Sequence, residues 1–198
     1  MAVRDVTGLY EEFGTDRLPP GQRRTTEFPV FTKGETPHVT REELTLAISG
    51  AVAEDRQFDW EEFTALPVET QRQDVHCVTG WSSFDHEFTG VPFTELLDRI
   101  SVDPAAEHVR FHAADGYSTD LPLEAAARPE TLLAFEHDDE PLARDHGGPL
   151  RVLTPHKYAY KGAKWLAGIE FRTEPVRGYW EKRGYSVTAD PWAEDRYS

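Results

Sequence analysis

The sequence predicts an α+β protein, or a mixed α/β protein, with an irregular sheet and short helices. Segments with the pattern of strands outnumber those with the pattern of helices, and the connections between them vary in length. The sequence has no internal repeat and no low-complexity tract. With 198 residues, the chain is long enough to bury a core and is expected to form one domain with extended arms.

Composition divides the chain into three regions. Residues 1–38 are rich in proline, glycine and charge, which predicts an extended N-terminal arm. Residues 39–175 hold most of the patterned apolar segments and are predicted to form the domain itself. Residues 176–198 form a polar tail with scattered aromatic side chains, which is expected to pack on that domain.

Hydrophobic patterns predict the elements of the domain. Alternating apolar residues predict a half-buried strand over 41–52. Asp59 as N-cap and two glutamates in the first turn predict a short helix over 59–66, which ends before Pro67. Further strands are predicted over 74–81, 108–113 and 164–172, and further helices over 90–100 and 121–128. Two apolar runs, 132–135 and 150–153, are separated by a polar loop.

The charge balance limits the partners of the protein. There are 21 basic and 36 acidic residues, a net charge of −15, which argues against nucleic acid and anionic membranes as partners. Acid excess with arginine preferred over lysine is typical of a salt-adapted, halophilic protein, although an ordinary acidic protein has the same features. No stretch approaches the roughly 18–20 apolar residues of a membrane span, and the N-terminus has no apolar signal core. We therefore expect a cytoplasmic protein.

Cys77 is the only cysteine, which excludes an intrachain disulfide and a multi-cysteine zinc site. Three interpretations are open for it. Cys77 is a small buried apolar residue, as free cysteines often are. Alternatively it is a nucleophile with His76 as base, but neighbours on a strand point to opposite faces. In the third interpretation it is the sole thiolate on a soft transition metal, whose other ligands come from an organic cofactor.

A basic cluster over residues 144–164 offers a place for a large anionic cofactor. This segment contains five basic residues and one acidic residue, Asp145, so its local charge is +4 in a chain of net −15. Gly147 and Gly148 give backbone that an anion can approach closely, and the combination suits phosphate. A hairpin with basic rims is the alternative. The cluster is neither a Walker loop nor a dinucleotide fingerprint.

Four segments resemble a known family in order and spacing: HCVTGWS (76–82), ADGYSTDLPLEAA (114–126), LLAFEHDDEPLARDHGGPLRVLTP (132–155) and YKGAKWLAGIEF (160–171). Together they resemble the molybdopterin-binding domain of the sulfite-oxidase-type oxidoreductases. Residues 18–37 resemble the arm of the single-domain, sulfite oxidase-like branch. The resemblance implies that family's α+β fold over 39–175 and a molybdenum–molybdopterin cofactor.

The resemblance also implies roles for single residues. Cys77 matches the thiolate bound to molybdenum, and Tyr117 matches an active-site tyrosine near the substrate oxygen. The positions expected to bind the cofactor are Phe31, Thr32 and Lys33 of the arm, His146, Arg151, Lys161, Gly162, Ala163 and Lys164. His156 is a further candidate beside the basic cluster, although a structural histidine fits it equally well.

The implied activity is oxygen-atom transfer on a small substrate, either reduction of an S-oxide or N-oxide or oxidation of sulfite. Sulfite oxidases place an arginine shortly after the cysteine, but here no arginine occurs between Cys77 and Arg99, which favours a neutral substrate. The sequence shows no second redox centre, so an external electron donor or acceptor is expected. The alternatives are a non-catalytic molybdopterin-binding module and a structural domain with a buried Cys77.

Overall fold

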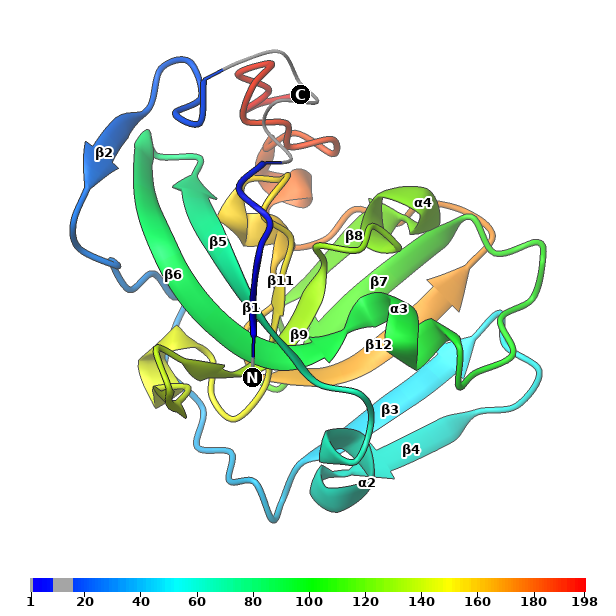
Figure 1. The fold of residues 1–198 in the computed structure, drawn as a ribbon. Helices are drawn as coiled ribbons and strands as arrows, with labels where there is room; N and C mark the ends of the chain where they lie inside the picture. The colour runs from blue at the N-terminus through cyan, green and yellow to red at the C-terminus, as the bar shows by residue number, and fades with distance from the viewer. Residues whose placement is uncertain (1, 9–15) are drawn as a thin grey trace.

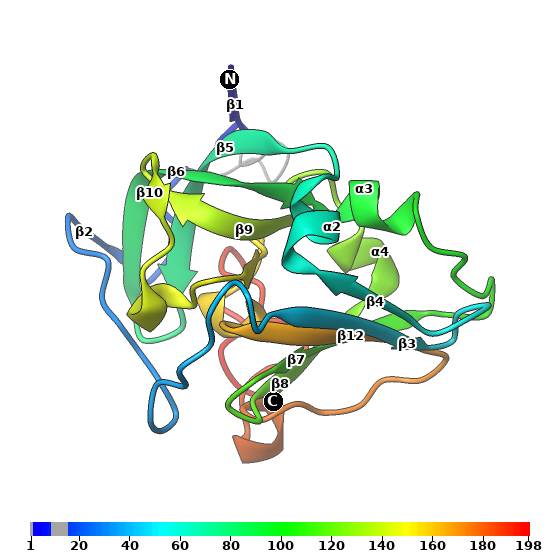
Figure 2. The ribbon, with the colours of Figure 1, turned by 90° about the horizontal axis from the view of Figure 1, so that it is seen from below.

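Two β-sheets lie face to face in the computed structural model, and the main hydrophobic core fills the space between them (Figures 1 and 2). The structure describes residues 2–8 and 16–198. The core takes apolar side chains from both sheets, including Leu46, Phe111 and Ile169 from one and Val91 and Leu133 from the other. Burying these side chains is the main favourable contribution to folding.

The first sheet carries the cysteine. Among the described residues it has seven strands, with β5, β6 and β9 antiparallel in its centre and the arm strands β1 and β2 paired in parallel to β5 and β6. Its strands are β1 (Val3–Asp5), β2 (Arg23–Thr25), β5 (Glu69–Cys77), β6 (Trp81–Pro92), β9 (Leu132–His137), β10 (Glu140–Pro141) and β11 (Arg151–Leu153).

The second sheet forms the other side of the core. Its five described strands follow the order β4-β3-β12-β7-β8, with only β3 and β12 parallel. They are β3 (Thr45–Gly50), β4 (Arg56–Asp59), β7 (His108–Ala113), β8 (Ser118–Pro122) and β12 (Leu166–Arg172). The predicted strand 108–113 has these bounds, the one over 164–172 begins two residues later, and the one over 41–52 is confined to 45–50.

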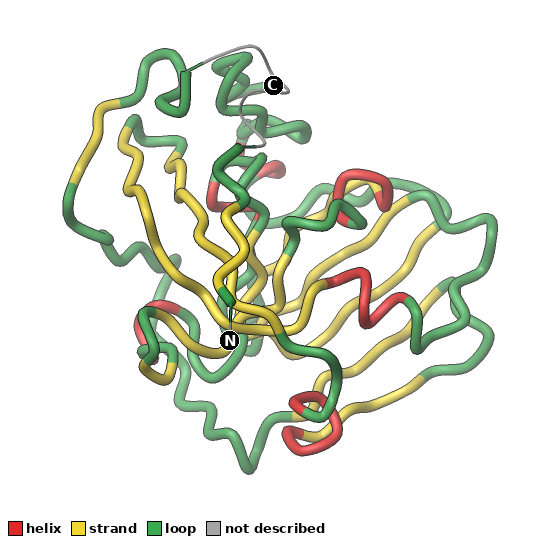
Figure 3. The backbone as a smooth tube through the Cα atoms, viewed as in Figure 1, coloured by secondary structure: helices red, strands yellow, loops and turns green. Residues whose placement is uncertain are grey.

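The helices are short, as predicted, and sit at the ends of strands (Figure 3). They are α2 (Trp60–Thr64), α3 (Phe93–Leu97) and α4 (Leu123–Ala126), with 3-10 turns η1 (Arg144–His146), η2 (Ala159–Lys161) and η3 (Glu181–Arg183). Asp59 and Glu62 form a capping box at the start of α2, which confirms the predicted N-cap.

Two boundaries differ from the prediction. The expected helix over 90–100 is wrong in its first turn, because Gly90 and Pro92 belong to β6 and pair with β9. A Cβ at Gly90 would lie 2.2 Å from the Leu133 carbonyl oxygen, so the two strands approach closely there. The expected strand over 74–81 is two strands, because the chain turns back between Cys77 and Trp81.

The tail, residues 176–198, packs on the domain near the end of β5. Tyr179 N–H donates to the Ser118 carbonyl at 2.8 Å, and the Arg196 guanidinium donates to the Val78 carbonyl, one residue after the cysteine. The tail therefore lies beside the turn that carries Cys77. In the described ranges no helix is long and apolar enough to cross a membrane.

Candidate active site

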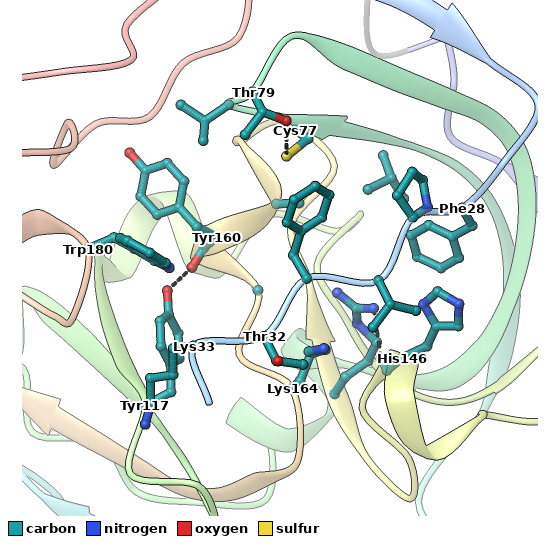
Figure 4. Close-up of a pocket in the computed structure, with 18 of the residues that line it drawn as sticks. Phe28, Thr32, Lys33, Cys77, Thr79, Tyr117, His146, Tyr160, Lys164 and Trp180 are labelled. Carbon is teal, nitrogen blue, oxygen red and sulfur yellow. Dashed lines mark hydrogen bonds between the residues drawn. The ribbon is translucent and has the colours of Figure 1, made fainter. Parts of the chain in front are cut away.

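A cavity of about 330 Å³ opens where five separate segments meet. They are the arm around 28–33, the turn after β5, the turn 115–117, the segment 146–165 and the tail. Figure 4 shows their side chains around one space, with Cys77 and Thr79 at one end and Lys33 and Lys164 at the other. The cavity has the size of a small-molecule site.

Cys77 is the last residue of β5, and the following turn holds it at the cavity wall. Its carbonyl accepts from Gly80 N–H at 3.0 Å and from the Gln22 side chain at 3.1 Å. Gly80 has φ +97°, a conformation that glycine adopts without strain. The Thr79 hydroxyl donates to the Cys77 sulfur at 3.2 Å. Burial raises the pKa of the thiol, so without a metal it is protonated at neutral pH.

His76 is not a base for Cys77. Its ring is buried away from the cavity, with Nδ1 2.8 Å from the Ser82 hydroxyl and the ring edge against Trp192. Burial lowers the pKa of His76 to about 3. The strand thus separates the two neighbours as its geometry predicts, so His76 does not activate Cys77 as a nucleophile.

Tyr117 lines the cavity from the turn between β7 and β8. Asp115 Oδ1 accepts from Tyr117 N–H at 2.9 Å, and the Tyr117 hydroxyl donates to the Tyr160 carbonyl. Burial raises the pKa of Tyr117 well above its ordinary value, so the phenol keeps its proton. Lys33 donates to the Asp115 carbonyl at 2.7 Å, which fastens the arm to this turn.

Arg151 and Lys164 give a positive charge to the cavity wall that lies away from Cys77. Among the described residues, no carboxylate lies within ion-pair distance of either side chain. Arg151 is 5% exposed and donates to the His146 carbonyl at 2.8 Å, while its buried Nε has no partner. Lys164 donates to the Asp145 carbonyl at 2.8 Å. Burial lowers the pKa of Arg151 to about 10. Burial, and then the charge of Arg151, lowers the pKa of Lys164 to about 8. Such a wall suits an anionic ligand.

Glycines let the two cationic segments meet. Gly147 has φ +109°, and a Cβ there would lie 2.9 Å from Lys164 Cβ. A Cβ at Gly162 would lie 2.5 Å from the Val152 carbonyl oxygen. Side chains at either position would push the backbone segments apart. The glycines therefore place Arg151 and Lys164 on one wall.

The structure brings most of the predicted site residues together and leaves three apart. The cavity is lined by Phe31, Thr32, Lys33, Cys77, Tyr117, His146, Arg151, Gly162 and Lys164. Lys161 lies outside this lining, because its buried ammonium pairs with Glu181 at 2.6 Å. Ala163 packs in the core, and His156 is buried with Nδ1 3.6 Å from Glu130. A cofactor contact of these three residues stays a prediction.

Several lining residues were not singled out from the sequence. Aromatic side chains come from the arm, from η2 and from the tail: Phe28, Tyr160, Trp180 and Tyr185. Thr79 adds the hydroxyl beside the cysteine. The one signal for the tail residues was the run GYWEKRGY, whose aromatic side chains stand in an otherwise polar segment.

A family model described as "Oxidoreductase molybdopterin binding domain" matches residues 33–180. The chain belongs to this family. The match confirms the predicted sulfite-oxidase-type molybdopterin fold, the molybdenum–molybdopterin cofactor and the class of oxidoreductase. The cavity of this molybdopterin domain fits such a group. Arg151 and Lys164, whose charges are not neutralised, would face the anionic part of the cofactor, and the Cys77 thiol at the other end would be a sulfur ligand for the metal.

Three relatives of this molybdopterin domain differ in length. The uncharacterized oxidoreductase YuiH of Bacillus subtilis is 40% identical over 185 residues, 92% of each chain. The protein-methionine-sulfoxide reductase catalytic subunit MsrP of Burkholderia mallei is 30% identical over 188 residues, 86% of this chain and 53% of MsrP. Mitochondrial sulfite oxidase of Drosophila melanogaster is 32% identical over 116 residues, 52% of this chain and 20% of that protein. The chain thus spans about half of MsrP.

A solved structure shows the same fold. The sulfane dehydrogenase SoxCD from Paracoccus pantotrophus superposes with a TM-score of 0.66 at 21% identity, over 71% of this chain and 41% of that one. At this identity the similarity concerns the fold alone. It agrees with the mixed sheets and short helices predicted from the sequence.

Proposed function

We propose that this molybdopterin oxidoreductase reduces a small neutral S-oxide or N-oxide, and that it does not oxidise sulfite. The observation that carries the proposal is the wall beside Cys77, which is apolar and aromatic, with Val78, Trp81 and Tyr185. The described cavity lining has three cations, and Lys33 already contacts Asp115. A doubly charged sulfite would need fixed cations beside Cys77, but the side chains at that wall are apolar.

Arg196 is a further cation near the cysteine. Its guanidinium donates to the carbonyls of Val78 and Gly21, so it holds the turn from behind. It is not part of the cavity lining. The positive charge of Arg196 lowers the pKa of the Cys77 thiol and so favours the thiolate. Because Arg196 lies outside the lining, it offers no site for a substrate anion.

In the proposed site each residue has a distinct role. The bound cofactor supplies two-electron oxygen-atom chemistry. Cys77 would hold the molybdenum through its sulfur, and the Thr79 hydroxyl at 3.2 Å would stabilise the thiolate. Arg151 and Lys164 would bind the anionic part of the cofactor. Tyr117, protonated at all relevant pH values, would donate its hydroxyl hydrogen to the substrate oxygen in place of the Tyr160 carbonyl.

A paired activity screen tests the proposal. The loaded enzyme is given a reduced dye with methionine sulfoxide, dimethyl sulfoxide or trimethylamine N-oxide, and separately sulfite with an oxidised acceptor. We expect turnover with at least one oxide and a kcat/KM for sulfite at least about 100-fold lower, about 2.7 kcal/mol in transition-state binding. Fast sulfite oxidation with no turnover of oxides would contradict it.

Replacing Tyr117 by phenylalanine tests the proton donor. We expect kcat to fall by about 100-fold, the lower end of general-acid contributions, with a smaller change in KM. Stability should fall by about 1 kcal/mol, because the Tyr160 carbonyl loses its donor. Tyr160→Phe is the matched control, since Tyr160 lines the same cavity but its hydroxyl donates to the Ser186 carbonyl at 2.6 Å. Unchanged kcat in Tyr117→Phe would show that Tyr117 is not the proton donor, whereas bound cofactor with no turnover in the wild type would favour the non-catalytic molybdopterin-binding module.

Other features stay predictions from the sequence. They are a cytoplasmic location, an external electron donor or acceptor and adaptation to high salt, the last supported by the net charge of −15.

A further inference from the structure

Two imidazoles and one carboxylate meet beside the cavity but outside its lining. His86 lies on β6, His137 ends β9, and Asp138 begins the turn to β10. Strand pairing sets Phe88 opposite His137, so His86 lies two residues along β6 on the same face. His86 Nδ1 is 2.9 Å from His137 Nε2, which is 3.3 Å from Asp138 Oδ2. Two strands and a turn thus direct three potential ligand atoms to one point.

The spacing of these atoms fits a metal ion. With metal–nitrogen bonds of about 2.0–2.1 Å, neighbouring ligand atoms are about 3.3 Å apart in a tetrahedron and about 2.9 Å apart in an octahedron. The two separations in the structure, 2.9 and 3.3 Å, fall within this range. All three ligand atoms lie within 4.8 Å of one another, and residues 2–8 and 16–198 contain no second such group of histidine, cysteine and acidic side chains.

Further contacts orient the three side chains as they do in metal sites. His86 Nε2 lies 2.8 Å from the Ser83 hydroxyl, which leaves Nδ1 directed at His137. Glu87 N–H donates to Asp138 Oδ1 at 3.1 Å, so Oδ2 remains for an ion. Such outer contacts fix the ring and carboxylate orientations of metal ligands. The Asp138 side chain is 61% exposed, which leaves the group open to solvent on one side.

We propose that His86, His137 and Asp138 form a second metal site, which binds a divalent transition ion of the zinc type. Imidazole with one carboxylate suits Zn²⁺, Ni²⁺ or Cu²⁺, whereas Mg²⁺ and Ca²⁺ prefer oxygen ligands alone. Three protein ligands leave at least one position for water. The site differs in chemistry from the single thiolate of Cys77.

The aromatic ring of Phe28 separates the second metal site from the cofactor cavity. Its centroid is 4.6 Å from that of His86 on one side and 4.1 Å from that of His146 on the other, where the two rings are stacked. His146 lines the cavity, whereas His86 does not. An ion at the second metal site would fix the β9–β10 turn against β6 and leave the cofactor pocket unchanged.

A zinc titration of the cofactor-loaded protein, freed of other metals on a chelating resin, tests the site. We expect isothermal calorimetry to show one Zn²⁺ per chain in the wild type and affinity reduced at least tenfold in Asp138→Asn. Asp139→Asn is the matched control, because Asp139 is the next residue in the same turn, also has positive φ and is not a ligand. It should bind Zn²⁺ like the wild type.

The thermal midpoint gives a second readout. Zn²⁺ should raise it in the wild type and in Asp139→Asn, and much less in Asp138→Asn, because an ion that binds only the folded chain stabilises it. Equal affinity in the wild type and Asp138→Asn would overturn the proposal, since the ion would then bind elsewhere. No binding in the wild type would overturn it too and leave the group as a hydrogen-bonded network. Because the Asp138 side chain is exposed, we expect Asp138→Asn to fold like the wild type, and circular dichroism measures this.

Discussion

Replacing Cys77 by alanine should abolish oxygen-atom transfer and remove molybdenum from the protein, at little cost to the fold. Loss of a group that only supports a metal ligand reduces affinity or activity by about 10- to 100-fold, so loss of the ligand itself should exceed about 100-fold. Cys77 is half-buried at a cavity wall, and removing its sulfur should cost about 1 kcal/mol. Molybdenum per chain by elemental mass spectrometry, with pterin fluorescence, measures the first effect.

Two further substitutions show whether the thiolate is responsible. Cys77→Ser keeps the size of the side chain but offers a hard oxygen, so it should lose molybdenum like alanine. Thr79→Val keeps the thiol and removes only the hydroxyl that donates to its sulfur at 3.2 Å. Activity should then fall by about 10-fold with molybdenum retained. Full molybdenum and activity in Cys77→Ala would return Cys77 to the role of a small apolar residue.

The sequence predicted the cysteine because it is unique and stands in a recognisable segment. It could not separate Lys161 from Lys164, which lie three residues apart in one basic cluster. The structure separates them through Glu181, a tail residue whose carboxylate pairs with Lys161, while the Lys164 ammonium donates to a backbone carbonyl and lies over the Trp165 ring. That distinction depends on a contact between distant segments, which periodicity and local charge do not encode.

Segment packing also explains what was missed at the cavity and in the fold. Phe28 and Tyr185 reach the cavity from the arm and the tail, where the sequence has no regular pattern. The helix expected over 90–100 begins late. The stretch Gly90–Pro92 is compatible with a helix start and with a strand, and its pairing with β9 makes it part of the strand. Local propensity is a weak prior that tertiary contacts override.

Replacing Arg151 by methionine should strongly weaken cofactor retention and leave the cofactor-free chain at least as stable as the wild type. Burial lowers the pKa of Arg151 to about 10, so below that pH the folded chain carries a charged group at a cost of about 3 kcal/mol, at about 1.4 kcal/mol per pKa unit. Methionine removes that cost and keeps the apolar stem. The His146 carbonyl loses its donor, which costs about 1 kcal/mol. Urea unfolding and pterin content measure the two effects.

Arg110→Met is the matched control, since Arg110 also has a buried Nε without a partner but lies on β7, outside the described cavity lining. It should retain the cofactor in full. If Arg151→Met destabilises the cofactor-free chain by several kcal/mol, then the charge of Arg151 stabilises the fold itself, and its role is not confined to binding an anion.

The pH dependence of cofactor retention gives an independent check on the same charges. Lys164 has a pKa of about 8 before the anion binds, so it is charged below pH 8 and neutral above. Retention should therefore weaken as pH rises through 8 in the wild type. The charge of Arg151 contributes to that lowered pKa, after burial, so Arg151→Met should raise the pKa of Lys164. The weak residual binding of this variant should then persist to higher pH than wild-type binding does, and a pH midpoint identical in both proteins would show that the charge of Arg151 does not lower the pKa of Lys164.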